Sequence, residues 1–270
     1  WEQRKFSNIV NRVSQQSNDS NLPKVEFEDI ISGEGRLNKD ISSKFDSRKG
    51  TVFEPEFILY GKLRPYLKNW LFPNFKGIAL GDFWVFEPNN SSSIFDYYLI
   101  QSDKYQTVAN LSSGTKMPRS DWKTVSETEF SIPVNIEEQT KIGSFFKQLD
   151  NTITLHQDAI QHQQDLKKAM LQKLFPVNGA RIPTVRFATF KEEWEQRKLG
   201  EITESYSGGT PSVANHSYYG GSIPFIRSAE INSINTELYL TEEGLNSSSA
   251  KLVEEGDILY ALYGATSGEV

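Results

Sequence analysis

A pentapeptide that occurs twice constrains the fold of this chain more than any other feature of its sequence. WEQRK stands at residues 1–5 and returns at residues 194–198, an offset of 193. Further matches follow in the same order: Phe6 with Leu199, Ile9 with Ile202, Val25 with Ile226, and FILY at 57–60 with DILY at 257–260. The offset changes only slightly along this series, as it does when loops differ in length between two related copies. The sequence therefore predicts two copies of one domain, which begin at Trp1 and Trp194.

Within these 270 residues the second copy is the shorter one, because it stops soon after DILY. The first copy continues for more than a hundred residues after FILY. Hydrophobic residues make up 37% of the chain, which is enough to build cores and excludes a disordered protein. We predict four regions: a first domain at 1–134, a helix at 135–176, a linker at 177–193 and an incomplete second domain at 194–270.

The first copy combines strand patterns with a short helical pattern. β-Branched and aromatic residues at 51–67 predict a strand with a turn at Gly61. Residues 77–88 predict a further pair of strands, bounded by glycines and a proline. Apolar residues at 95–111 recur at near-helical spacing and predict one short amphipathic helix. Together these patterns predict a first copy built of strands and turns with a short helix.

A much longer helix is predicted at 136–174, where the sequence contains no proline and only one glycine. Asn135 and Glu138 have the spacing of a capping box at its start. At 1.5 Å per residue the helix spans about 58 Å, whereas a domain of this size is about 30 Å across. We therefore expect the helix to project and to pair with another helix. The apolar stripe expected to make this contact consists of Ile142, Phe146, Leu149, Ile153 and Ile160.

Residues that usually perform catalysis are scarce. The chain has no cysteine and three histidines, which excludes a thiolate metal site and leaves little for a catalytic triad. His156 and His162 lie six residues apart on the predicted helix and point to different faces, so they do not form a metal site. Phosphate-loop, dinucleotide-binding, nucleophile-elbow and amino-methyltransferase signatures are absent from the sequence. We predict a non-catalytic protein without a metal or cofactor of its own.

Composition and charge restrict the location and the partner. No apolar run is long enough to span a membrane, and the first residues lack a signal-peptide pattern. With the absence of cysteine, this indicates a cytoplasmic protein. The formal net charge of −6 argues against a protein that binds nucleic acid over its whole surface. A local basic face on an acidic body is still compatible with this charge.

Three stretches have the composition of a binding surface. Residues 59–70 interleave cations with aromatic rings, as a groove that holds phosphates and meets base edges requires. Residues 112–122 form a loop rich in small donors, and residues 207–228 place two tyrosines between Gly-Gly turns before a strand with an outward arginine. A solvated strand, a surface turn and a loop with buried tyrosines are the structural alternatives. The candidate DNA-contacting residues are Lys62, Arg64, Tyr66, Lys68, Lys116, Arg119, Thr210, Tyr218, Tyr219 and Arg227.

Several phrases of the chain are shared with one known family. The helical run from 132 to 175 contains Pro133, Glu138, Gln139, Leu149 and Asp150 and ends in LQKLF. This run resembles the conserved spacer helix of type I restriction-modification specificity subunits. WEQRKLGEI, SGGTPS, YYGGSIPFIRS and YGKLRPYL are typical of the target-recognition domains of that family. The resemblance covers essentially the whole chain and accounts for the repeat, since such subunits carry two recognition domains, each followed by a spacer helix.

The resemblance implies a DNA-binding role without catalysis. Each recognition domain would be an α+β unit with a curved β-sheet that reads one half of a bipartite double-stranded site. The paired helices would set the gap between the halves. Modification subunits would hold S-adenosylmethionine and methylate adenine, and restriction subunits would consume ATP with Mg²⁺. The specificity subunit would have no active site and no cofactor.

The chain departs from the family pattern in three respects. The lead-in before Trp1 is missing, the second domain stops at Val270, and the second spacer helix is absent. We therefore expect a fragment or a truncated product whose spacer helix pairs with that of a second chain. Trp1 is expected to lie at the junction of the first domain and the spacer helix, away from DNA.

A protein of another class is the alternative. A β-rich module that binds protein or glycan and carries a coiled-coil stalk would fit the acidic composition and the tyrosine-rich loops. The two hypotheses differ in where the cations lie. DNA recognition requires Lys62, Arg64, Lys116 and Arg119 on one face, whereas scattered positions favour the alternative.

Overall fold

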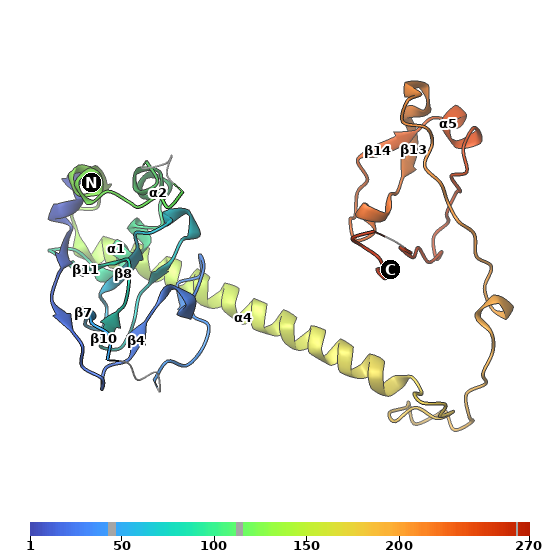
Figure 1. Ribbon diagram of the computed structural model, residues 1–270, viewed down its shortest axis with the longest axis horizontal. Coiled ribbons are helices and arrows are strands. Elements are labelled where there is room, and N and C mark those ends of the chain that lie inside the picture. The colour runs from blue at the N-terminus through green and yellow to red at the C-terminus, as the bar shows by residue number, and fades with distance from the viewer. Residues whose placement is uncertain (43–46, 112–115, 263) are drawn as a thin grey trace. The chain divides into compact units, whose positions relative to one another are not determined.

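The computed structural model describes residues 1–42, 47–111, 116–262 and 264–270, and the chain divides into two compact units, Trp1–Met170 and Leu171–Val270 (Figure 1). The strands of the first unit are β1 (Glu2–Lys5), β2 (Val10–Val13), β3 (Gln16–Ser17), β4 (Lys24–Val25), β5 (Ile30–Ile31), β6 (Arg36–Leu37), β7 (Gly50–Phe53), β8 (Ile58–Gly61), β9 (Trp70–Leu71), β10 (Gly77–Ala79), β11 (Phe83–Pro88) and β12 (Glu129–Ile132). Its α-helices are α1 (Ser93–Leu99), α2 (Asp103–Ala109), α3 (Trp122–Glu127) and α4 (Ile136–Leu174).

Two four-stranded sheets form the body of the first unit. One sheet has the order β2-β11-β8-β9 and the other β3-β7-β10-β4, while β1 pairs with β12 and β5 with β6. The strands predicted around FILY and at 77–88 are confirmed as β8, β10 and β11. The two strands at 77–88 do not pair with each other as expected. β10 pairs with β4 and β7, and β11 pairs with β2 and β8.

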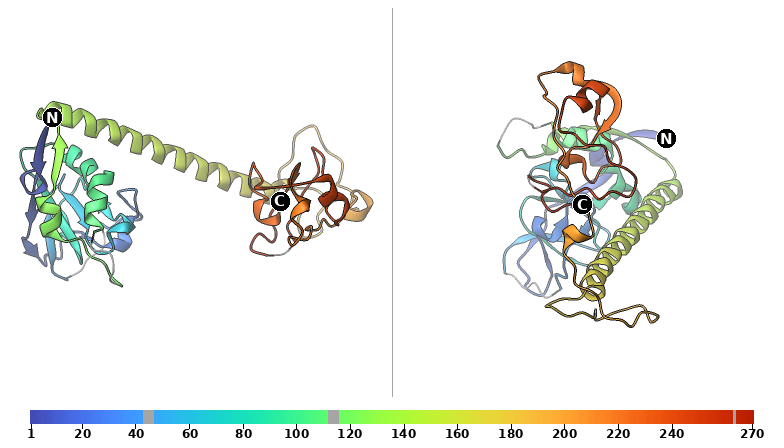
Figure 2. Two further views of the ribbon diagram at one scale, coloured as in Figure 1. Left: turned by 90° about the horizontal axis from the view of Figure 1, so that it is seen from above. Right: turned by 90° about the vertical axis from the view of Figure 1, so that its right-hand side faces the viewer.

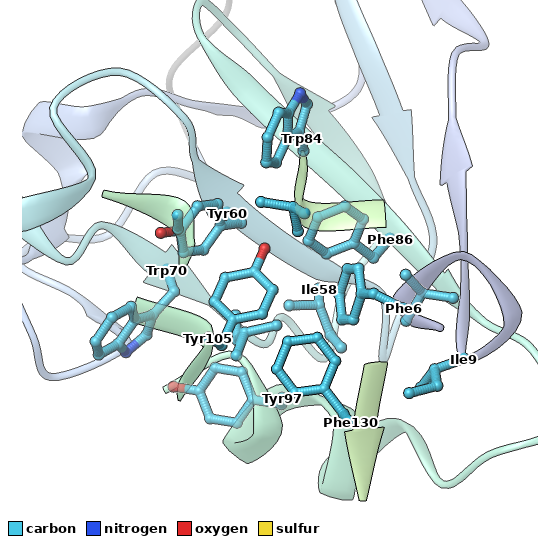
Figure 3. Packing of buried hydrophobic residues seen from close by; sticks show 14 of the residues in the cluster. Phe6, Ile9, Ile58, Tyr60, Trp70, Trp84, Phe86, Tyr97, Tyr105 and Phe130 are labelled. Carbon is cyan, nitrogen blue, oxygen red and sulfur yellow. The ribbon is translucent and has the colours of Figure 1, made fainter. Parts of the chain in front are cut away.

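The two faces of β8 contribute to two different cores. Ile58 and Tyr60 lie in one apolar cluster, and Leu59 lies in the other, because successive side chains of a strand point to opposite faces. Figure 3 shows the first cluster, in which Phe6 lies next to Tyr105 and Phe130, with ring centroids 5.1 and 5.8 Å away. A strand buried on both faces reads as a continuous apolar run, which explains FILY.

The helix predicted at 95–111 is two helices. α1 ends at Leu99 and α2 begins at Asp103. Ser102 is the N-cap of α2, and its side chain accepts a hydrogen bond from the backbone N–H of Tyr105. A serine that caps a new helix separates it from the preceding one, because the capping residue takes an extended backbone conformation.

The long helix α4 is confirmed. Asn135 precedes it, and its side-chain oxygen accepts a hydrogen bond of 2.7 Å from the N–H of Glu137. Glu138 does not reach back to complete a capping box; its carboxylate accepts a hydrogen bond of 3.2 Å from the indole N–H of Trp1. Figure 2 shows the N-terminus beside the first turns of α4. Trp1 therefore lies where the first domain meets the helix, as expected.

The second unit has less regular structure. It contains β13 (Tyr219–Phe225), which pairs antiparallel with β14 (Leu238–Leu240), and the short helix α5 (Glu242–Asn246). Gly220 and Gly221 lie within β13, where the register shifts, so the Gly-Gly turn predicted after the tyrosines is wrong. Residues 194–198 and 257–260 are irregular. The mixed α+β class, the long helix and a smaller β region after it are thus confirmed.

Candidate nucleic-acid interface

The first basic segment connects β8 to β9 and has an unusual backbone. Arg64 and Lys68 take left-handed conformations, with φ of 50° and 53°, at the two ends of a helical turn formed by Pro65–Leu67. Left-handed backbone costs non-glycine residues about 1 kcal/mol each, so the surrounding contacts must maintain this turn. Tyr66 at its centre is exposed. Tyr60 and Trp70 are buried in the core, which leaves Tyr66 as the ring of this segment that could stack on a base.

The second basic segment lies directly beside the first. The N–H of Arg64 donates to the carbonyl of Pro118 at 2.7 Å, and the N–H of Ser120 donates to the carbonyl of Lys62 at 2.8 Å. An antiparallel bridge joins Leu63 to Arg119. Residues 62–68 and 116–120 are therefore adjacent, and together we call them the basic loop surface. Residues 112–115 of the predicted loop lie outside the described residues.

An acidic residue that the sequence did not single out lies between the cations of this surface. Asp82 follows Gly81, whose φ of 87° allows the turn from β10 to β11. The backbone carbonyl of Asp82 accepts a hydrogen bond of 2.9 Å from the N–H of Lys62. Its carboxylate contacts the guanidinium of Arg119 at 3.1 Å and the amine of Lys62 at 3.6 Å. Partial burial tends to raise the pKa of Asp82, but the hydrogen bonds and charges of Arg119 and Lys62 outweigh it and hold that pKa low.

The candidate residues of the second unit lie in a different environment. The guanidinium of Arg227, which is partly exposed, binds the carboxylates of Glu230 and Glu237 at 2.8 and 2.7 Å. These two hydrogen-bonded carboxylates raise the pKa of Arg227. Tyr218 and Tyr219 are half-buried, and the hydroxyl of Tyr219 donates to the carbonyl of Pro211.

Thr210 of the second unit is exposed. Thr210, Tyr218, Tyr219 and Arg227 belong to one segment, and its arginine, Arg227, already has acidic partners. The basic loop surface of the first unit has the opposite balance, with two cations on one carboxylate. The first unit therefore offers the more complete candidate interface.

The apolar stripe of α4 is divided between two environments. Ile142 packs against the first core, and Phe146 lies against the ring of Tyr98 with centroids 5.3 Å apart, although 43% of its surface is still exposed. Leu149, Ile153 and Ile160 are exposed. Phe145, which the stripe omitted, is also exposed, and it lies next to these three because it precedes Leu149 by four residues.

Two other kinds of site are absent from the described residues. No group of three or more histidine, aspartate or glutamate side chains there is arranged to hold a metal ion. No helix in the described part of the chain is long and apolar enough to cross a membrane.

Comparison with known proteins identifies the family. The type I restriction modification DNA specificity domain matches residues 15–163 and 191–270, most of the chain. The chain therefore belongs to the type I restriction-modification DNA specificity family. The matched segments fall in both copies of the repeat, and the prediction of a specificity protein rather than an enzyme is confirmed by this assignment.

The chain is similar to a curated specificity subunit and to two solved structures. The specificity subunit of the type I restriction enzyme MjaVIII of Methanocaldococcus jannaschii is 26% identical over 174 residues, which cover 62% of this chain and 41% of that protein. A solved structure concerned with complex assembly and conformational transition of the type I R-M system matches with a TM-score of 0.51 and 20% identity, over 89% of this chain and 65% of the other. The HsdS subunit of Thermoanaerobacter tengcongensis gives a TM-score of 0.44 at 22% identity, over 68% and 51%. The chain thus spans less than two thirds of the relatives that it matches.

Proposed function

We propose that this chain reads one half of a bipartite double-stranded DNA sequence through the basic loop surface of its first unit. The observation that supports the proposal is the adjacency of two basic segments separated by about fifty residues of sequence. Lysine and arginine on one surface neutralise phosphates, and arginine also binds guanine edges in the major groove. The same adjacency argues against the protein- or glycan-binding alternative, for which scattered cations were expected.

The partners and the activity of the whole assembly follow from the family. We propose that modification subunits with S-adenosylmethionine, and restriction subunits with ATP and Mg²⁺, bind this chain and carry out adenine methylation and DNA cleavage. The family assignment and the likeness to a structure concerned with assembly of a type I system support this. Such a complex would act on DNA in the cytoplasm.

The exposed part of the α4 stripe supports a second contact. Phe145, Leu149, Ile153 and Ile160 expose apolar surface along one side of the helix. We propose that this side pairs with a spacer helix, which in the 270-residue chain would be that of a second copy. Sedimentation should show a dimer that Ile153→Lys disrupts, while Leu155→Lys, at a more exposed site on another side of the helix, should leave it intact. A monomer at every concentration would exclude pairing.

Alanine variants test the DNA interface. We expect Lys62→Ala, Arg64→Ala, Lys116→Ala and Arg119→Ala to weaken binding of a labelled duplex of mixed sequence. The slope of log affinity against log salt concentration should fall by about 0.9 for each phosphate contact that is lost. Lys76→Ala is the control, because it removes the same charge where Lys76 pairs with Glu54. If all four variants match the control in affinity and salt slope, the assignment of this surface is wrong.

A further inference from the structure

One face of α4 is attached to the first unit over five turns of the helix. Gln139, Gly143, Phe146 and Asp150 are spaced by four, three and four residues, so they lie on the same side. Gln157 continues this side and accepts a hydrogen bond of 3.4 Å from Arg36. From Gln139 to Gln157 the helix rises about 27 Å, and contacts distributed over that length restrict its direction.

Gln139 is the innermost of these residues, with 1% of its surface exposed. Its side-chain oxygen accepts from the backbone N–H of Ser92 at 2.9 Å, and its side-chain nitrogen donates to the carbonyl of Pro133 at 2.8 Å. The hydroxyl of Thr140 contacts that of Ser92 at 3.0 Å. A buried amide is tolerated where its donor and acceptor are satisfied. Gln139 therefore joins α4 to the segment before α1 and to the segment after β12.

Gly143 allows α4 to approach α1 closely. A Cβ atom at this position would lie 2.7 Å from Cγ2 of Ile94 and 2.8 Å from the backbone nitrogen of Phe95. Two of the neighbouring atoms belong to the backbone of α1, so a side chain here would force the two helices apart. The glycine is otherwise unfavourable, because glycine weakens the interior of a helix relative to alanine.

The next contacts along α4, at Phe146 and Asp150, are made by α1. The hydroxyl of Tyr98 donates to the carboxylate of Asp150 at 2.7 Å, and its ring lies against Phe146. Since α1 follows β11, and β11 pairs with β8, the same sheet carries both the attachment of α4 and the basic loop surface. Attachment through α1 therefore relates the direction of the helix to the position of the candidate DNA contacts.

We propose that Gln139 and Gly143 are positioning residues that set the direction of α4 and thereby the gap between the two DNA half-sites. The proposal rests on the proposed function. Lys168 lies 25 residues beyond Gly143, or about 37 Å along the helix, so a tilt of about 5° at the attachment moves that point by about 3 Å. One base pair of DNA is about 3.4 Å long. A small error in the attachment therefore corresponds to about one base pair of gap.

Spin-label distances test the attachment without DNA. The chain contains no cysteine, so Thr107→Cys on α2 and Lys168→Cys on α4 introduce two labels at exposed positions. In a mixture with excess unlabelled chain, so that only distances within one chain are measured, the otherwise unchanged chain should give one narrow distance distribution. Gly143→Ala should shift its mean by about 3 Å, and Gln139→Met, which keeps the size but loses both hydrogen bonds, should broaden it. Gln148→Met makes the same chemical change at an exposed position of α4 and should do neither.

Selection from a random duplex library, with the chain bound to its modification subunits, tests the consequence. The unchanged chain should retain two half-sites at one separation, while Gly143→Ala should change the separation by about one base pair and Gln139→Met should retain several separations. Distance distributions equal to that of Gln148→Met would overturn the attachment. Altered distributions with an unchanged separation would overturn its role in setting the gap. If the unchanged chain selects no sequence, the proposed function and the gap role both fail, and the distances still decide the attachment.

Discussion

Ile58 and Ile258 occupy matching positions of the two copies, in FILY and DILY, but their environments are opposite. Ile58 is completely buried in β8, whereas Ile258 is 79% exposed in irregular chain. β8 lies between β9 and β11. The same apolar motif thus forms a core strand only where neighbouring strands pair with it, since β-structure depends on those neighbours.

Amide hydrogen exchange should give the largest contrast between the copies. The N–H of Phe6 donates to the carbonyl of Thr128 beneath a buried ring, while the matching Leu199 is 71% exposed. We expect peptides around Phe6 to exchange at least about a thousandfold more slowly than peptides around Leu199, because core amides open only with most of the stability of the domain. Equal exchange in the two peptides would show that the second copy folds as well as the first.

Core substitutions at matching positions should give the next largest effect. Ile58→Ala is expected to lower the free energy of unfolding of the first unit by about 3 kcal/mol, the usual cost of a cavity in a packed core. Ile258→Ala should change the free energy of unfolding of the second unit by less than about 0.5 kcal/mol, as exposed sites do. Urea titration followed by fluorescence reports the first unit, since Trp70 and Trp84 lie in its core, and urea-dependent hydrogen exchange of peptides from residues 171–270 reports the second. Similar losses in both variants would contradict the contrast.

The two units should respond to pH in opposite directions. Burial raises the pKa of Asp96 from 3.8 to about 8, although hydrogen bonding to Ser91 and the charge of Arg4 oppose this. The folded state then binds a proton that the unfolded state releases, so the first unit should lose stability as pH rises from about 4 to about 8. In the second unit, the hydrogen bonds of Arg227 lower the pKa of Glu230 from 4.5 to about 2. The stability that ionised Glu230 contributes is fully present above its unfolded pKa of 4.5 and is lost as pH falls toward 2.

Asp96→Asn tests the first half of this contrast. The variant should be more stable than the unchanged chain at pH 8.5, by a few kcal/mol at most, and should gain nothing at pH 4. Urea titrations at the two pH values measure the difference. Glu230→Gln is the comparison, because its loss of stability in the second unit should disappear at low pH. A constant gain of Asp96→Asn at both pH values would mean that ionisation of this carboxylate does not limit stability.

Charge removal near the candidate interface should give the smallest effect. Asp82 meets two cations in the first unit, whereas Arg227 meets two carboxylates in the second. Asp82→Asn should raise affinity for a duplex of mixed sequence roughly two- to fivefold at low salt, with less effect as salt increases. Glu87→Gln removes the same charge five residues along β11 and should change affinity less. Equal effects would show that Asp82 does not act on the DNA surface.

Much of the fold of the first unit follows from local sequence. Residues 136–174 lack proline and are long enough to be recognised as one helix, and β-branched and aromatic residues around FILY mark a strand, although its burial on both faces was not predicted. The division of 95–111 into two helices also had a local signal, because Ser102 precedes Asp103 as an N-cap. The boundaries of the four predicted regions remain predictions, as do the individual DNA contacts.

The candidate interface was only partly visible in the sequence. The cations were recognised from composition, but Asp82 was not, because it lies between the two basic segments in sequence and contacts them only through strand pairing. Tyr60, Tyr66 and Trp70 are all interleaved with cations in the sequence, yet Tyr60 and Trp70 are buried and Tyr66 is exposed. Alternation along β8 decides this for Tyr60, since a one-residue change of register would reverse which side chains face the core.

The sequence by itself determined the repeat, the long helix, the absence of catalytic motifs and the resemblance to a DNA specificity family, because each depends on local composition or collinear matches. Only the tertiary structure decided that Leu63 lies beside Arg119, that Gln139 is buried at the base of α4, and that FILY forms a strand while DILY does not. These outcomes depend on contacts between residues far apart in the chain. A strand or a buried amide is stable only where such a contact satisfies its hydrogen bonds and removes its apolar surface from water.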